Sequence, residues 1–156
     1  MFVLGIDPGL TTTGYGFVRR HRDLEAIAAG VIRTDPDSAL TTRLLEIHRR
    51  LAELIVEHRP DAIALEQVFT NRNLQTAIAV GRAAGVAILA AAQHQLEVFE
   101  YPPTVIKSAV TGDGAADKRM VATMVGRRGG GATPSPTTTA ADPAIARCPL
   151  APFPVF

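Results

Sequence analysis

The sequence contains one cysteine, Cys148, no tryptophan, and an aromatic share of only 5% in 156 residues. A single cysteine excludes a disulfide framework within the chain and is typical of a reducing cytosol. No basic segment followed by a cleavable apolar stretch lies near residue 1, so secretion is not expected. Glycine, arginine and glutamine interrupt the longest apolar run, so no transmembrane segment is expected either. We therefore expect a cytoplasmic protein that does not bind membranes.

A strong charge of one sign is also missing, because 16 basic and 15 acidic residues leave a formal net charge of +1. Any binding to nucleic acid must therefore depend on where the charges lie and not on their total. What the sequence does have is a hydrophobic share of 47% and a charged share of 20%. At this length, these values are typical of a globular domain with one core.

The apolar pattern predicts strands at residues 2–6, 14–18, 26–32, 62–65 and 97–101. Apolar residues at helical spacing predict a helix over residues 40–55, capped by Asp37 or Ser38. A second helix, rich in alanine and glycine, is predicted over residues 74–96, capped by Asn73 or Asn71, and further helices follow residue 101. Three consecutive strands indicate an antiparallel meander, and the later alternation indicates parallel strands. The expected fold is α/β, a mixed five-stranded sheet flanked by helices.

Two predicted strands end on an acidic residue, Asp7 in "LGIDPGLTTTGYGFV" and Glu66 in "AIALEQVF". Asp-Pro-Gly is also a good turn sequence, so a simple turn is one interpretation of Asp7. If the two strands are parallel neighbours, however, their carboxyl ends meet at the edge where open α/β sheets bind ligands. Two carboxylates so placed repel each other unless a proton or a cation lies between them. Oxygen ligands favour a hard ion such as Mg²⁺, and the four histidines show no metal-ligand spacing.

Four motifs occur in order: "GIDPGLTTTGYGFV", "AIALEQVF", "QTAIAVGRAAGVAILAAA" and "VIKSAVTGDGAADKRMV". Together they closely resemble the RuvC family of Holliday junction resolvases over about residues 2 to 125. The resemblance implies an RNase H-like fold and a homodimer that cuts two opposing strands of four-way junction DNA. It also implies Mg²⁺ or Mn²⁺, with two ions per active site, and cooperation with the RuvA–RuvB branch-migration complex. The implied roles are DNA recombination and repair.

The resemblance also assigns roles to individual residues. Asp7 and Glu66 match the family's first two metal-binding, catalytic carboxylates, and Phe69 matches an aromatic residue that is placed against bases at the crossover. A core position is the alternative for Phe69. The remaining residues expected on DNA are polar or basic: Asn71, Arg72, Lys107, Lys118 and Arg119.

The last 31 residues depart from the family pattern, because they hold 4 of the 13 glycines and 6 of the 11 prolines. Such a composition cannot sustain the long final helix that carries the family's remaining carboxylates. We therefore divide the chain into a resolvase domain, residues 1–125, and an atypical tail, residues 126–156. "TTTAADPAIARC" resembles a damaged form of the family's acidic motif, with Thr139 in place of the first aspartate and Asp142 as the second. Asp142 is accordingly a candidate third metal ligand and catalytic residue, or else a residue without function.

Three alternatives remain open at this point. The tail could reflect an altered reading frame, since the composition changes abruptly near Gly126. The chain could bind junctions but cleave them poorly, because a neutral threonine replaces an acid. The glycine-rich hairpin also resembles the phosphate loop of actin-like kinases and chaperone ATPases, which need two such domains to enclose a nucleotide.

Overall fold

The computed structural model describes residues 1–22, 24–67 and 73–105. Its elements follow in the order β1 (Phe2–Asp7), β2 (Thr12–Arg20), β3 (Leu24–Arg33), α1 (Leu40–His58), β4 (Ala62–Glu66), α2 (Leu74–Gln93) and β5 (Glu97–Tyr101). All five strands join one sheet in the order β3-β2-β1-β4-β5. β1 to β3 form the antiparallel meander, and β4 and β5 run parallel to β1, so the mixed sheet predicted from the sequence is confirmed.

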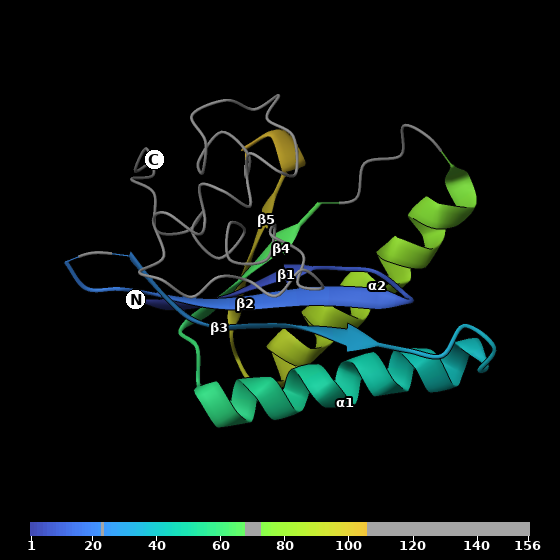
Figure 1. Cartoon of the computed structure of the whole chain (residues 1–156), viewed down its shortest axis with the longest axis horizontal. Coiled ribbons are helices and arrows are strands. Elements are labelled where there is room, and N and C mark those ends of the chain that lie inside the picture. The colour runs from blue at the N-terminus through green and yellow to red at the C-terminus, as the bar shows by residue number, and fades with distance from the viewer. Residues whose placement is uncertain (23, 68–72, 106–156) are drawn as a thin grey trace.

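One face of the sheet packs against α1 and α2, as Figure 1 shows. Alternate residues of the central strands supply that face, because side chains of a strand point to opposite sides in turn. Leu4, Ile6, Ile63 and Leu65 are buried there. Against them pack apolar residues of α1 and small residues of α2: Ile47, Leu51, Ile55, Ala83, Ala84, Ala87, Ala90 and Ala91.

The parallel register of β1 and β4 is fixed at the end of the sheet opposite to Asp7. Asp61 Oδ2 accepts a hydrogen bond from the Phe2 N–H at 2.6 Å, and the Asp61 N–H donates to Phe2 O at 2.7 Å. Val3 consequently pairs with Ala62, and the two strands stay in register up to Ile6 and Leu65.

The ends of the two helices differ in part from expectation. Asn73 caps α2 as predicted, since its Oδ1 accepts from the N–H groups of Gln75 and Thr76. The capping of α1 by Asp37 or Ser38 is wrong, because its N-cap is Ala39 and no side chain caps it. Asp35 instead accepts hydrogen bonds from the Asp37 N–H and the Ser38 hydroxyl. α2 also ends at Gln93, three residues earlier than predicted.

α2 is long and apolar enough to cross a membrane on length and composition alone, which corrects the expectation that no segment could do so. One such helix is weak evidence for a membrane span, because a core helix passes the same test. In this fold α2 packs its buried alanines against α1 and the sheet. Its opposite side is exposed and apolar, with Leu74 70% and Ile78 45% accessible.

Candidate active site

Asp7 and Glu66 end neighbouring parallel strands. The paired positions that precede them are Ile6 and Leu65, so the next step along both strands brings Asp7 and Glu66 to the same level. Neighbouring strands lie about 4.8 Å apart. The prediction that the two acid-bearing strands are parallel neighbours is therefore confirmed.

Both acids belong to the face of the sheet that α1 and α2 do not cover. Ile6 and Leu65 point into the helix-covered core, and strand residues alternate between faces. Asp7 and Glu66, each one residue further along, therefore share the opposite face. Both are partly buried, and both take part in interactions within the fold.

Two further strands define the surroundings of the pair. Gly14 of β2 pairs with Asp7, so no side chain flanks Asp7 on that side. Tyr101 of β5 pairs with Glu66, is only 8% exposed, and by the same alternation lies on the same face. The Gln67 N–H donates to Tyr101 O at 2.9 Å and holds the chain where it leaves β4. Tyr101 was not singled out from the sequence, where it looks like an ordinary aromatic residue of a strand.

The turn after Asp7 is closed by Thr13. Its hydroxyl donates to Gly9 O at 2.7 Å and accepts from the Gly9 N–H at 3.3 Å, and the side chain is 1% exposed. A Cβ on Gly9 would lie 2.3 Å from Thr12 O, so only glycine fits this turn without a backbone shift. The turn interpretation of Asp-Pro-Gly and the ligand interpretation of Asp7 are thus compatible.

The pair suits a hard divalent cation. Carboxylate oxygens at adjacent positions repel each other, and a cation between them removes that repulsion. Oxygen donors are those that Mg²⁺, Mn²⁺ and Ca²⁺ prefer. Within residues 1–22, 24–67 and 73–105 no group of three acidic, histidine or cysteine side chains could hold a metal, so this part of the chain offers two carboxylates only.

The other predicted site residues lie outside the described part of the chain. They are the proposed third carboxylate, the aromatic residue and the polar and basic residues expected on DNA: Asp142, Phe69, Asn71, Arg72, Lys107, Lys118 and Arg119. Thr139 and the boundary at residue 126 lie outside it as well. The roles of all these residues stay predictions.

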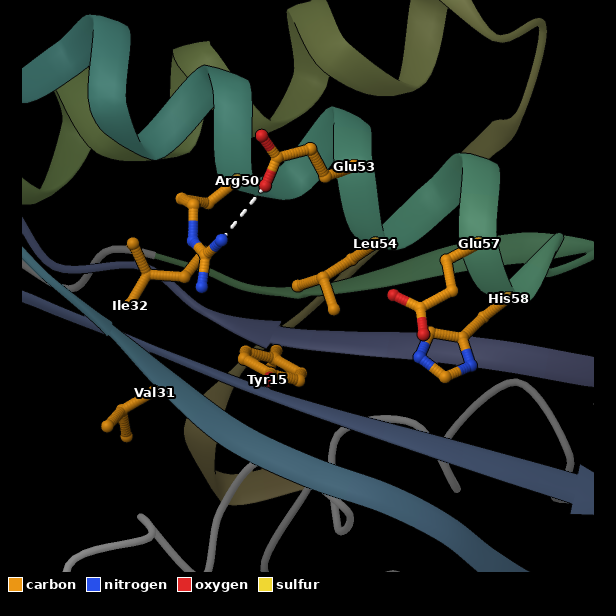
Figure 2. Close-up of a pocket in the computed structure, with 8 residues that line it drawn as sticks. All are labelled: Tyr15, Val31, Ile32, Arg50, Glu53, Leu54, Glu57 and His58. Atoms are coloured by element: carbon orange, nitrogen blue, oxygen red, sulfur yellow. Dashed lines mark hydrogen bonds and ion pairs between the residues drawn. The ribbon is translucent and has the colours of Figure 1, made fainter.

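A hollow of about 270 Å³ lies on the helix-covered side, between α1 and the strands β2 and β3 (Figure 2). Tyr15 and Leu54 line it together with charged residues of α1, among them Arg50, whose Nη1 donates to Glu53 Oε2 at 3.0 Å. His58 lies at one end, and its ring packs against Phe17 with centroids 4.3 Å apart and the two planes tilted by 40°. His58 is therefore a half-buried packing residue.

The family model for "Crossover junction endodeoxyribonuclease RuvC" matches residues 3–148. Among curated proteins, RuvC of Salinispora arenicola is 48% identical over 129 residues, which cover 81% of this chain and 74% of that protein. RuvC of Alkaliphilus metalliredigens is 47% identical over 126 residues, which cover 80% of this chain and 77% of that protein. Both carry the name crossover junction endodeoxyribonuclease.

Solved structures of the same kind superpose closely. RuvC of Thermus thermophilus in complex with a Holliday junction substrate matches with a TM-score of 0.86 and 36% identity, over 94% of this chain and 90% of that one. A second T. thermophilus RuvC structure matches with a TM-score of 0.84 and 35% identity, over 94% of this chain and 91% of that one. The predicted RNase H-like fold is thereby confirmed.

Proposed function

The chain belongs to the RuvC family of crossover junction endodeoxyribonucleases, and from this membership we propose that Asp7 and Glu66 form the metal-binding part of its active site. The chain is a Holliday junction resolvase, a hydrolase that acts on four-way DNA junctions in recombination and repair. A binding module that no longer cleaves is not favoured by these relatives. The single observation that supports the proposed site is the register, which brings two strand-end carboxylates to one level on the face opposite to α1 and α2.

The proposed chemistry uses Mg²⁺, with Mn²⁺ as an alternative, and two ions per site. A divalent cation bound here supplies the activation of water and the neutralisation of phosphate charge that phosphodiester hydrolysis needs. Asp7 and Glu66 would hold it from two strands whose backbones are hydrogen-bonded into the sheet, so its position relative to the DNA would be fixed. The donor set fits, because both side chains offer only carboxylate oxygens.

The remaining residues complete the proposal. Asp142 would add a third carboxylate and lies within the residues that match the family model, which supports its inclusion. Phe69 would contact bases at the crossover. The polar and basic side chains would contact the DNA backbone: Asn71, Arg72, Lys107, Lys118 and Arg119. In this proposal residues 1–125 form the resolvase domain, and residues 126–156 replace the family's usual final helix.

A homodimer is part of the proposal, because two sites related by a two-fold axis match the two opposing strands of a junction. The exposed side of α2 supports it. Gly81 and Gly85 have open space where a Cβ would stand, and apolar side chains flank them along the same face: Leu74, Ile78 and Ile88. Partnership with a RuvA–RuvB complex, a cytoplasmic location and the absence of membrane binding complete the proposal.

A cleavage assay on a mobile four-way junction tests the proposed site. With Mg²⁺ the protein is expected to cut two opposing strands. Asp7→Asn is expected to bind the junction normally, because the shape of the side chain persists. Its cleavage rate is expected to fall by at least about 100-fold, because one ligand charge is lost. Asp37→Asn, the same change at an exposed acid before α1, is the matched control and should cut normally. Normal cutting by Asp7→Asn would reduce Asp7 to a turn residue.

A further inference from the structure

The turn between β1 and β2 is held from outside by residues far away in the sequence. The Thr34 hydroxyl, just after β3, donates to Leu10 O at 2.6 Å, and the Thr34 N–H donates to Thr11 O at 3.1 Å. Arg43 of α1 contacts both the turn and Thr34. Its Nε donates to Thr34 Oγ1 at 3.0 Å and its Nη2 donates to Thr11 Oγ1 at 2.8 Å.

Arg43 occupies a position that does not favour a cation. It lies in the first turn of α1, where its N–H donates to Ala39 O, and that turn contains no acidic residue. The helix dipole opposes positive charge near a helix N-terminus. Among the described residues Arg43 belongs to none of the ion pairs, unlike Arg49 and Arg50 of the same helix. Two neutral hydroxyls are what its guanidinium contacts instead.

These contacts bear on the proposed site because of where the turn begins. The turn starts directly after Asp7, and Thr12 at its far end pairs with Arg33 of β3. Thr34 is 8% exposed, so its hydroxyl is shielded from water, and exchanging it for a methyl group would leave Leu10 O without that donor. Functional carboxylates tolerate displacements of only about 0.5 Å.

We propose that Arg43 and Thr34 are positioning residues of the cleavage reaction, which set the orientation of Asp7 by bracing residues 8–11. This inference rests on the proposed role of Asp7 as a metal ligand. In this proposal the two residues act through the backbone of the turn and not by direct contact with DNA or the metal. A guanidinium suits this role because its rigid, forked group contacts two hydroxyls at once. An ammonium group, which is a compact point charge, does this less well.

The test compares Thr34→Val, Thr34→Ser, Arg43→Gln and Arg43→Lys with the parent protein. Three quantities are measured: the affinity for the four-way junction without divalent ions, the affinity for Mn²⁺ by calorimetry, and the Mg²⁺ concentration for half-maximal single-turnover cleavage. Thr34→Val and Arg43→Gln should raise that concentration and the Mn²⁺ dissociation constant about tenfold, at the low end of what supporting residues of metal ligands contribute. Junction affinity should be unchanged. Thr34→Ser, which keeps the hydroxyl, should restore both values, and Arg43→Lys should fall between.

Hydrogen exchange in the metal-free protein gives an independent readout. The Gly9 and Thr34 amides should exchange faster in Thr34→Val and Arg43→Gln, while the amides in the middle of β1 should not change. Arg50→Gln is the matched control, because it removes the same charge two turns further along α1 and its partner is Glu53, not the turn.

The outcomes separate this inference from its alternatives. Lower melting temperatures with unchanged Mn²⁺ affinity and Mg²⁺ dependence would mean that the contacts serve stability alone, and the inference would be wrong. Weaker junction binding by Arg43→Gln, together with a normal Mg²⁺ dependence of cleavage in Thr34→Val, would indicate that Arg43 contacts a DNA phosphate. That result would also contradict the inference. Asp7→Asn is measured in parallel. If it binds Mn²⁺ and cuts normally, the proposed function of Asp7 fails; if it is inactive while the Thr34 and Arg43 variants behave normally, only the bracing fails.

Discussion

At the scale of single residues, the proposed site depends on groups that shape the backbone around Asp7 as much as on Asp7 itself. Thr13 satisfies both polar groups of Gly9, and Asp61 sets the register five residues before Glu66. None of these residues carries the chemistry. Each restricts the position of a carboxylate. These positions decide whether the two acids at the ends of the two strands can bind the same ion.

Gly9→Ala tests this dependence. Its Cβ would overlap the carbonyl oxygen of Thr12, so the turn must move, and we expect a loss of about 1–3 kcal/mol in the free energy of unfolding. Chemical denaturation measures the loss. Thr42→Ala, at an exposed position in α1, is the control and should be neutral or slightly stabilising. Equal stabilities of the two variants would contradict the role assigned to Gly9.

The acidic ends of β1 and β4 could be predicted from the sequence, whereas β2 and β3 extend beyond their predicted bounds at both ends and the contacts around the site could not be predicted. An apolar run that stops at an acid is a local signal, and parallel pairing then follows from general rules of α/β folds. The contacts of Arg43 and Thr34 with the turn join residues that are far apart in the sequence. They depend on the positions of β2, β3 and the start of α1, and no local sequence pattern indicates them. The missed cap of α1 has a similar cause, since Asp35 takes the Ser38 hydroxyl that could have capped the helix.

At the scale of elements, Asp7 and Glu66 lie on one face of the sheet, and α1 and α2 support the sheet from the other. α1 does so with large apolar side chains, and α2 does so with alanines, which bring its backbone closer to its neighbours. The amphipathic pattern of α1 was enough to predict its buried side, because Ile47, Leu51 and Ile55 recur at helical spacing. α2 is apolar nearly all round, so its sequence could not reveal which side is buried.

Leu51→Ala tests how much α1 contributes. The side chain is fully buried in the main core, so we expect the free energy of unfolding to fall by about 2–5 kcal/mol. Leu45→Ala removes the same atoms from the same helix at a position that is 66% exposed, and should change stability by less than about 0.5 kcal/mol. Urea denaturation followed by circular dichroism measures both. A small effect of Leu51→Ala would contradict the packing of α1 described above.

At the scale of the whole molecule, the proposal assigns DNA to the sheet face that carries Asp7 and Glu66, and a second copy of the chain to the exposed side of α2. The net charge of +1 gives no general attraction to DNA, so recognition must come from local groups and, in the proposed dimer, from the geometry of its two sites. The composition of residues 126–156 remains the least ordinary feature of the sequence. On the alignment proposed above, Thr139 replaces one acid of the family's final motif and Asp142 is the proposed third ligand.

The proposed dimer predicts a specific effect of Gly85→Arg. Nothing lies within 4 Å of a Cβ at Gly85, so the subunit should fold normally, while a long cation should block close approach of a second α2. Light scattering at micromolar concentration should report a dimer for the parent protein and a monomer for the variant. Val56→Arg, on the exposed side of α1, should remain dimeric. A dimer that survives Gly85→Arg would place the interface elsewhere.

The measurement that tests the account most directly is calorimetry of Mn²⁺ binding. It compares the parent protein with Asp7→Asn, Glu66→Gln and the double variant. If the two carboxylates hold the same ion, each single change should weaken binding almost as much as both together, because interactions made by one site are not additive. Independent, additive losses, or Mn²⁺ binding that neither change affects, would contradict the central claim that Asp7 and Glu66 form one metal site.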